Sequence, residues 1–158
     1  RYTTRSTLDL CKRLAGVEAF DLDVAACTES HHAPRWYHAP GAFHLNTLGA
    51  AGSDGLMQPW SGRVWCNPPF SDITPWVLRA WEQAPQCEVI AMLLPAWTDR
   101  RWWAENVEPF RDGRGAHAHA RLTTHFLPRV TFGQPGNPAG IGCGSPPFWC
   151  VLLVWRRA

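Results

Sequence analysis

Apolar residues along the chain alternate between helical spacing and short continuous runs. Spacings of three and four predict helices at residues 8–15, 72–83 and 98–107, and apolar runs predict strands at 20–26, 64–66, 87–94, 124–132 and 147–155. Because helices and strands alternate up to Leu94, we predict an α/β fold with a mostly parallel, doubly wound sheet. No helix separates the last two strands, so they should form an antiparallel hairpin at one edge.

The expected ends of the helices carry their own signals. Gly16 is the expected C-cap of the first helix. Ser71 or Asp72 is the expected N-cap of the second, and Thr98 or Asp99 that of the third. Between the predicted elements, periodicity is lost at residues 28–52, 111–119 and 133–145. Long irregular segments inside a domain are often functional or mobile, and this is what we expect of residues 28–52.

Composition indicates one soluble globular domain spanning residues 1–158, with 46% hydrophobic and 18% charged residues. No apolar run is long enough to cross a membrane and no signal-peptide pattern is present, so we expect a protein of the bacterial cytoplasm without membrane contacts. The 6 cysteines include no Cys-x-x-Cys pair, which favours buried free thiols over disulfides or zinc ligands. The sequence predicts no oligomeric state.

Histidines gather loosely in the first irregular segment, at His31, His32, His38 and His44. No cysteine or carboxylate stands beside them at the spacing of metal ligands, so no metal site is predicted.

Charge is informative in its distribution rather than its total, which is only +2. Lys12 is the only lysine, and arginines concentrate between Arg100 and Arg129. Arginine suits phosphate binding, although a GC-rich genome would produce the same bias. Arg100 and Arg101 stand at the start of a predicted helix, where the helix dipole disfavours cations. With Trp97 at the end of the preceding strand, they are the predicted nucleic-acid contacts.

The segment Asn67-Pro68-Pro69-Phe70 carries the strongest chemical signal. It follows a short predicted strand, and the prolines end that strand abruptly because they fix φ and donate no hydrogen bond. The Asn67 amide oxygen and the Pro68 carbonyl oxygen can accept both protons of an exocyclic amine, while Phe70 offers a ring for stacking. The segment therefore predicts a site that activates a planar amine, with a proline-stiffened turn as the alternative.

Two acids stand near the ends of predicted strands. Asp23 precedes Val24-Ala25-Ala26, whose small residues allow a ligand to come close. A carboxylate there could accept a hydrogen bond from an amine or hydroxyl group of a cofactor, with Ala25 beside it. Asp54, in an Asp-Gly pair, is placed to approach the same crevice. The alternatives are a solvated loop aspartate at Asp23 and a simple turn at Asp54.

Five segments follow one another in a fixed order: Asp23–Ala26, Asp54–Leu56, Trp60, Asn67–Phe70 and Leu93–Asp99. In this order and at these spacings they resemble the phage-type DNA N-6-adenine methyltransferase family, over most of the chain from about Thr3 to the last strand. The resemblance implies the Rossmann-like fold of S-adenosylmethionine-dependent methyltransferases. In that fold a seven-stranded sheet ends in an antiparallel hairpin.

The resemblance also implies roles for single residues. Asn67 to Phe70 match the catalytic tetrapeptide, Asp23 the acid of the first cofactor motif, and Asp54 the acid that meets the adenine of the cofactor. Thr3 and Thr4 stand where the family has a Thr-Pro pair at the methionine end of the cofactor. The proline of that pair is missing here, and the Asp23 segment lacks the Phe-x-Gly-x-Gly pattern of larger DNA methyltransferases.

The implied reaction is direct methyl transfer from S-adenosylmethionine to N6 of an adenine in double-stranded DNA. The base would be extruded from the duplex and held against Phe70. Three alternatives stay open. Asn-Pro-Pro-aromatic segments also serve the methylation of adenine in RNA and of glutamine in proteins, and an inactive relative could bind nucleic acid without catalysis.

Overall fold

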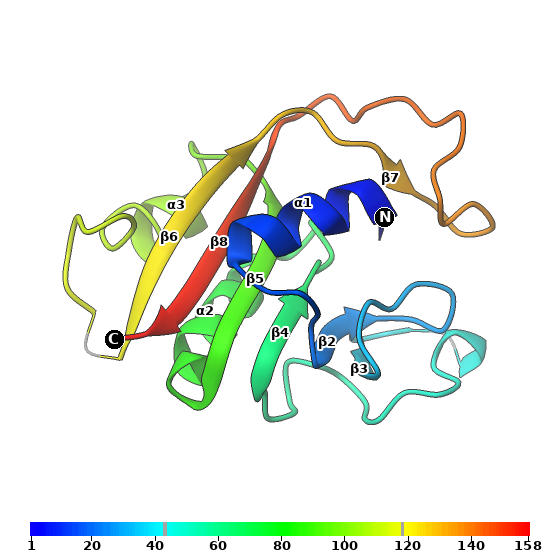
Figure 1. Cartoon of the computed structure of the whole chain (residues 1–158), viewed down its shortest axis with the longest axis horizontal. Helices are drawn as coiled ribbons and strands as arrows, with labels where there is room; N and C mark the ends of the chain where they lie inside the picture. Colours follow the sequence, from blue (N-terminus) through cyan, green and yellow to red (C-terminus); the bar gives the residue numbers. More distant parts are fainter. Residues whose placement is uncertain (43, 118) are drawn as a thin grey trace.

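The computed structural model describes residues 1–42, 44–117 and 119–158. Its central sheet is built from β2 (Leu22–Ala26), β3 (Arg35–His38), β4 (Gly62–Cys66), β5 (Cys87–Pro95), β6 (Ala120–Leu127) and β8 (Cys150–Arg157). Within the described residues these six strands lie in the order β3-β2-β4-β5-β8-β6 (Figure 1). Strands β3, β2, β4 and β5 run parallel, whereas β8 is antiparallel to both β5 and β6.

This topology confirms the mostly parallel sheet with an antiparallel pair at one edge. It corrects the expectation of seven strands, because the sheet has six in the part of the chain that the structure describes. Beyond the outer strand β3, a single parallel bridge joins Tyr37 to Gly52. The chain between β3 and β4 also donates backbone hydrogen bonds to this strand, from Ala51 to the Trp36 carbonyl oxygen and from Gly55 to that of His38.

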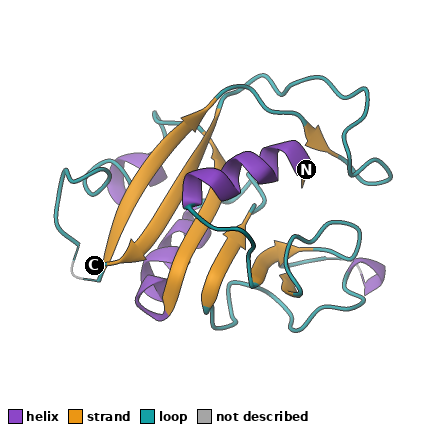
Figure 2. Cartoon of the chain, viewed as in Figure 1, coloured by secondary structure: helices purple, strands orange, loops and turns teal. Residues whose placement is uncertain are grey.

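Helices cover both faces of the sheet, which gives three layers (Figure 2). The helix α1 (Arg5–Ala15) lies on one face, and α2 (Thr74–Gln83) and α3 (Arg101–Asn106) lie on the other. The central strand β5 is buried on both sides because successive residues point to opposite faces. Val89, Ala91 and Leu93 share a core with α1, whereas Ile90, Met92 and Leu94 share one with α2 and α3. The tryptophans of α2 are core residues, as their spacing predicts.

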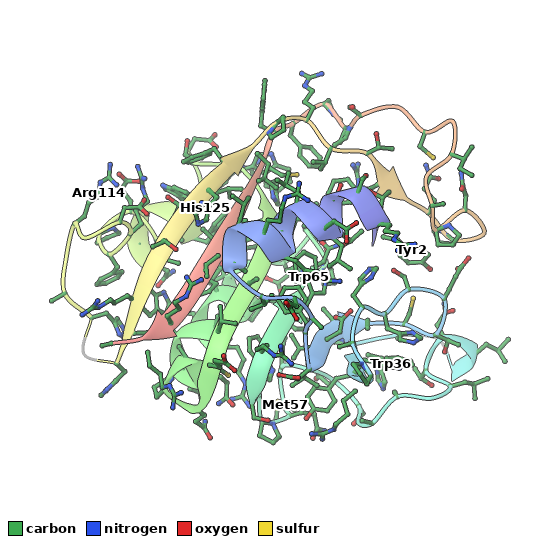
Figure 3. All side chains as sticks on the ribbon, in the orientation of Figure 1. Tyr2, Trp36, Met57, Trp65, Arg114 and His125 are labelled. Atoms are coloured by element: carbon green, nitrogen blue, oxygen red, sulfur yellow. The ribbon has the colours of Figure 1, made fainter. Side chains whose placement is uncertain are left out.

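A two-stranded ribbon lies outside the main sheet. It pairs β1 (Tyr2–Thr3) with β7 (Phe132–Gly133), which belongs to the long connection between β6 and β8. The Thr4 hydroxyl strengthens the ribbon by donating to the Thr131 carbonyl oxygen at 3.2 Å. Trp65, on β4, lies beneath α1 near this ribbon (Figure 3). The ribbon therefore holds the start of the chain beside the end of β4.

Helix starts differ from their predicted positions. The N-cap of α2 is Ile73 rather than Ser71 or Asp72, and that of α3 is Arg100 rather than Thr98 or Asp99. Neither N-cap side chain makes a capping hydrogen bond. In α2 a proline occupies the first turn, and its missing N–H removes one of the donors that a cap would satisfy. Gly16 does end α1 as predicted, with a left-handed φ of 70°.

The observed strand bounds also differ from those that the pattern of apolar residues predicts. The segment expected to be irregular, 28–52, contains β3 and the short 3₁₀ turn η1 (His44–Asn46). Strand β6 ends at Leu127 because Pro128 follows, and β8 begins at Cys150, beyond Pro147. The predicted bounds were 124–132 and 147–155. The first half of β6 was missed because edge strands carry polar residues on their solvent side.

Two further findings concern the whole fold. Among the described residues, no helix combines the length and the apolar character needed to traverse a bilayer. All 6 cysteines are free, and Cys11, Cys66, Cys87 and Cys150 are buried.

Gly55 fixes the chain between β3 and β4 against the sheet. Its N–H donates to the His38 carbonyl oxygen at 3.1 Å, and its own carbonyl oxygen accepts from Trp60 Nε1 at 2.8 Å. A Cβ at this position would lie 1.8 Å from the Val24 carbonyl oxygen. Only glycine fits this close approach to β2.

We predict that Gly55→Ala lowers the free energy of unfolding by about 2 kcal/mol, because the methyl group forces β2 and the turn apart. The melting temperature should fall by roughly 6 °C. Gly144→Ala is the matched control, since a Cβ there meets no atom within 4 Å. Thermal unfolding of both variants checks this, and equal melting temperatures would contradict it.

Candidate functional site

A cavity of about 360 Å³ opens at the carboxyl ends of β2 and β4. Of the residues that the sequence singles out, it is lined by Thr3, Asp23, Ala25, Asn67, Pro68 and Pro69. Two other hollows, of about 510 and 460 Å³, lie on either side of the β1 segment. The first cavity is the candidate site because ligands of parallel sheets bind at the carboxyl ends of the strands, and because it contains a buried carboxylate.

Asp23 is that carboxylate, and only 2% of its surface is exposed. It accepts hydrogen bonds from the backbone N–H groups of Ala25, at 3.3 Å, and His32, at 3.0 Å. Burial raises its pKa to about 7 despite these two bonds. In the part of the chain that the structure describes, no cationic side chain forms an ion pair with it. The cavity wall therefore carries an acid that a cationic or hydroxyl-bearing ligand would stabilise in its ionised form.

His32 is a cavity residue that the sequence did not identify as such. Its ring lies edge-on to Trp65, and Nε2 is 3.4 Å from Ser30 Oγ. Burial lowers the pKa of His32 to about 4, so the ring is neutral at neutral pH and does not neutralise Asp23. Its role at Asp23 comes from the backbone N–H, which no sequence pattern reveals.

Two other histidines of the loose cluster, His31 and His38, point elsewhere. His31 stacks on Trp36 with ring centroids 5.0 Å apart, and His38 Nδ1 is 2.9 Å from the Ala39 carbonyl oxygen. The side chain of His44 lies outside the described residues. Among the residues described, no group of three or more His, Cys, Asp or Glu side chains is placed to hold a metal ion.

Asn67 stands at the end of β4 with its side chain half-buried in the cavity wall. Its amide nitrogen donates to Thr3 Oγ1 at 2.8 Å and, more weakly, to the Arg1 carbonyl oxygen at 3.4 Å. A carbonyl oxygen can only accept, so the amide must turn its nitrogen toward Arg1. Within the described residues no hydrogen bond is made to Asn67 Oδ1 or to the Pro68 carbonyl oxygen. Two acceptors are therefore available at one end of the cavity.

Phe70 lies outside the cavity lining, half-buried in a group of aromatic rings. Its ring meets those of Trp97, Phe132 and Phe148 edge-on, with centroids 6.5, 6.0 and 5.9 Å away. We call Phe70, Trp97, Phe132 and Phe148 the aromatic cluster. Stacking of a base on Phe70 stays a prediction.

Asp54 and Thr4 also lie outside the cavity lining. Asp54 adopts a positive φ of 44° and its Oδ1 accepts from the Leu56 N–H at 3.1 Å, which is the turn that the alternative interpretation expected. Thr4 is buried and contributes to the β1–β7 ribbon. Contact of either residue with a cofactor stays a prediction.

Of the predicted nucleic-acid contacts, Trp97 belongs to the aromatic cluster, and Arg100 lies over its ring. The Arg100 guanidinium lies 4.9 Å from the centre of the Trp97 ring and 3.9 Å from an Asp99 carboxylate oxygen. Arg101 is exposed and pairs with Glu105 one turn along α3. None of the three predicted residues lines the cavity, so they are placed to act on its surroundings rather than inside it.

Comparison of the sequence with protein families finds one match. The family described as DNA N-6-adenine-methyltransferase (Dam) matches residues 10–112, which include Asp23, Asp54 and the Asn67–Phe70 segment. The comparison with curated proteins finds no significant match.

Solved structures with the same fold include two methyltransferases. The 23S rRNA methyltransferase ErmE has a TM-score of 0.54 and 13% identity, over 99% of this chain and 69% of its own. A proposed RNA methyltransferase from Pyrococcus horikoshii has a TM-score of 0.51 and 15% identity, over 100% of this chain and 87% of its own. The sheet and its helices therefore form the Rossmann-like fold of S-adenosylmethionine-dependent methyltransferases.

The buried acid predicts a pH-dependent stability. The pKa of Asp23 is about 7 in the folded chain against 3.8 for a free side chain, so the folded state binds this proton more tightly. Stability should then fall as the pH rises from about 4 to about 7, by an amount on the order of 4 kcal/mol.

Asp23→Asn removes the titrating group. We predict that the melting temperature of Asp23→Asn minus that of the wild type, both measured without ligand, increases as the pH rises from 5 to 8. Scanning fluorimetry at several pH values checks this, and a difference that does not change with pH would contradict it.

Proposed function

Because the chain belongs to the DNA N-6-adenine-methyltransferase (Dam) family, we propose that it transfers a methyl group from S-adenosylmethionine to N6 of adenine in DNA. Family and fold establish it as a methyltransferase and imply S-adenosylmethionine as the cofactor. The observation that carries the choice of acceptor is the pair of free oxygens at Asn67 and Pro68, which suits an exocyclic amine.

The cavity beside Asp23 fits this cofactor. Its volume of about 360 Å³ lies within the range of small-molecule sites. Asp23 is suited to accept from an amine or hydroxyl group of the cofactor, and Ala25 leaves room at the strand end. When bound, S-adenosylmethionine supplies a methyl group on a positively charged sulfur and leaves as a neutral thioether.

Asn67 and Pro68 act on the acceptor. Asn67 Oδ1 and the Pro68 carbonyl oxygen each accept a hydrogen bond from one N–H of the adenine amine, which draws the nitrogen out of conjugation with its ring. Both oxygens also stabilise the positive charge that develops on the nitrogen during transfer. Once methylated, the nitrogen passes one of its two protons to water. Alignment and charge stabilisation suffice, and no covalent link to the enzyme is needed.

Thr3 acts as a positioning residue for Asn67. By accepting from the amide nitrogen, its hydroxyl keeps the donor side of the amide away from the acceptor position. An amide turned by half a rotation would present N–H groups to an amine that needs acceptors. The Arg1 carbonyl oxygen, which can only accept, determines the productive orientation, and the shorter bond to Thr3 holds the amide in it.

The target base must leave the duplex to reach these oxygens, because an adenine inside the base stack cannot enter the cavity. We expect the extruded base to lie between Asn67 and Phe70. The rings around Phe70 hold it in place, so it can serve as a fixed stacking surface.

Adenine in RNA is the second candidate acceptor, since both structural neighbours are described as RNA methyltransferases. Their likeness is one of fold alone, whereas the family description specifies DNA. Incubation with tritiated cofactor and separate pools of DNA, RNA and protein tests the choice. We expect label in DNA, and label in RNA or protein alone would refute the proposed acceptor. Cofactor binding without transfer to any pool would favour an inactive nucleic-acid-binding relative.

We predict that Asn67→Ala lowers kcat for DNA methylation at least about 100-fold, because it removes one of two oxygens that stabilise the transition state. Calorimetry should give a Kd for S-adenosylmethionine within about threefold of the wild-type value. Asn106→Ala, at the end of α3 and outside the cavity lining, is the matched control and should keep wild-type kcat. Wild-type turnover by Asn67→Ala would show that the amide is not catalytic.

Thr3→Val should lower kcat about tenfold, since the amide of Asn67 loses its partner and rotates. Thr3→Ser keeps the hydroxyl and should retain activity. The decisive comparison places Thr3→Val in an Asn67→Asp background, where the two carboxylate oxygens are equivalent and orientation no longer matters. The loss of kcat should then be much smaller, and an equal loss in both backgrounds would rule out the positioning role.

A further inference from the structure

A second pair of cationic and aromatic side chains lies beside the aromatic cluster. Arg129 follows the end of β6, and Trp149 precedes the start of β8. The Arg129 guanidinium lies 6.0 Å from the centre of the Trp149 ring. The pair repeats the arrangement of Arg100 over Trp97, at 4.9 Å.

Strand pairing places this pair on the same side of the sheet as Asn67, where the parallel strands have their carboxyl ends. Cys150 is in register with Pro95, the last residue of β5, and the Ala96 N–H donates to the Trp149 carbonyl oxygen at 2.7 Å. Because β4 and β5 are parallel, the end of β5 and the end of β4 lie at one edge. Trp149 is thus anchored at the carboxyl end of β5, the strand next to β4.

Ring contacts connect this pair to the predicted catalytic segment. Phe148, the neighbour of Trp149, contacts both Phe70 and Trp97, with centroids 5.9 and 5.6 Å away. Phe148 is half-buried against the core, whereas Trp149 is 56% exposed. The alternation turns one ring toward Phe70 and the next toward solvent.

The exposed pair has the chemistry of a nucleic-acid contact. Arg129 is exposed and, among the described residues, forms no ion pair that would neutralise it. A free guanidinium suits phosphate, and an exposed tryptophan suits the face of a base. Extrusion of an adenine leaves the neighbouring bases with an uncovered face, which a tryptophan next to the site could cover.

We propose that Trp149 and Arg129 form a DNA contact beside the site, in which Trp149 stacks on a base next to the extruded adenine and Arg129 binds an adjacent phosphate. This rests on the proposed function, since it assumes a DNA substrate. It adds the connection between β6 and β8 to the substrate-binding surface. That connection contains the ribbon strand β7 and none of the residues that the sequence predicted to contact DNA.

The test measures the affinity for labelled mixed-sequence duplex DNA, the KM for the same DNA and the Kd for S-adenosylmethionine. Trp149→Ala should weaken DNA affinity and raise KM about tenfold, because one stacked base is lost. Trp149→Phe should restore much of the affinity. Arg129→Ala should weaken DNA binding and make the slope of log affinity against log salt shallower by about 1. The Kd for the cofactor should stay unchanged in all three.

Two matched controls come from the chain itself. Arg121→Ala removes an exposed arginine from the opposite end of β6, and Ile141→Ala removes a side chain that is 81% exposed in the same connection. Both should bind DNA as the wild type does. Equal DNA affinity in the wild type, Trp149→Ala and Arg129→Ala would overturn the inference, as would a loss confined to cofactor binding. If the wild type binds DNA without methylating it, the proposed function fails while the binding measurements still test this contact.

Discussion

The site depends on the fixed orientation of one amide. The proline after Asn67 disfavours a helical backbone at that residue, and the strand before it cannot continue because two prolines offer no ladder hydrogen bonds. Its side chain is then held by Thr3, a residue 64 positions earlier in the chain that the β1–β7 ribbon fixes in place. Backbone and side chain are constrained independently, and among the described residues Asn67 Oδ1 and the Pro68 carbonyl oxygen accept no hydrogen bond at the end of β4. Catalysis by alignment requires this kind of prior constraint.

The same organisation explains why the cavity retains an unfavourable group. A carboxyl group as buried as that of Asp23 costs stability when it ionises, and two backbone hydrogen bonds offset only part of that cost. A ligand that donates to the carboxylate or carries positive charge recovers the rest. The buried Asp23 thus lowers the stability of the unliganded fold and favours binding of such a ligand at the end of β2. The ribbon connects this cavity to the segment between β6 and β8, so the candidate cofactor site, the amide and the proposed DNA contact depend on one set of contacts.

Sequence alone predicted the parallel sheet, which the structure confirms, and it predicted that a strand ends before Asn67, because both follow from local patterns. A continuous apolar run, and prolines directly after a strand, act through nearest neighbours. It did not reach β3, whose four residues are too short and too polar to show a period, nor the role of His32, which acts through its backbone. The partnership of Thr3 with Asn67 joins positions 64 residues apart, and only the fold brings them together. The spacing of residues along the sequence does not reveal long-range contacts of this kind.

The central claim is that the end of β4 presents acceptors to the amine of adenine in DNA. Nucleoside mass spectrometry tests it most directly, after duplex DNA has been incubated with the protein and with cofactor that carries a deuterated methyl group. We predict that the label appears on N6-methyldeoxyadenosine released from the DNA. Label on cytosine, or DNA without label under conditions in which RNA or protein is methylated, would contradict the account.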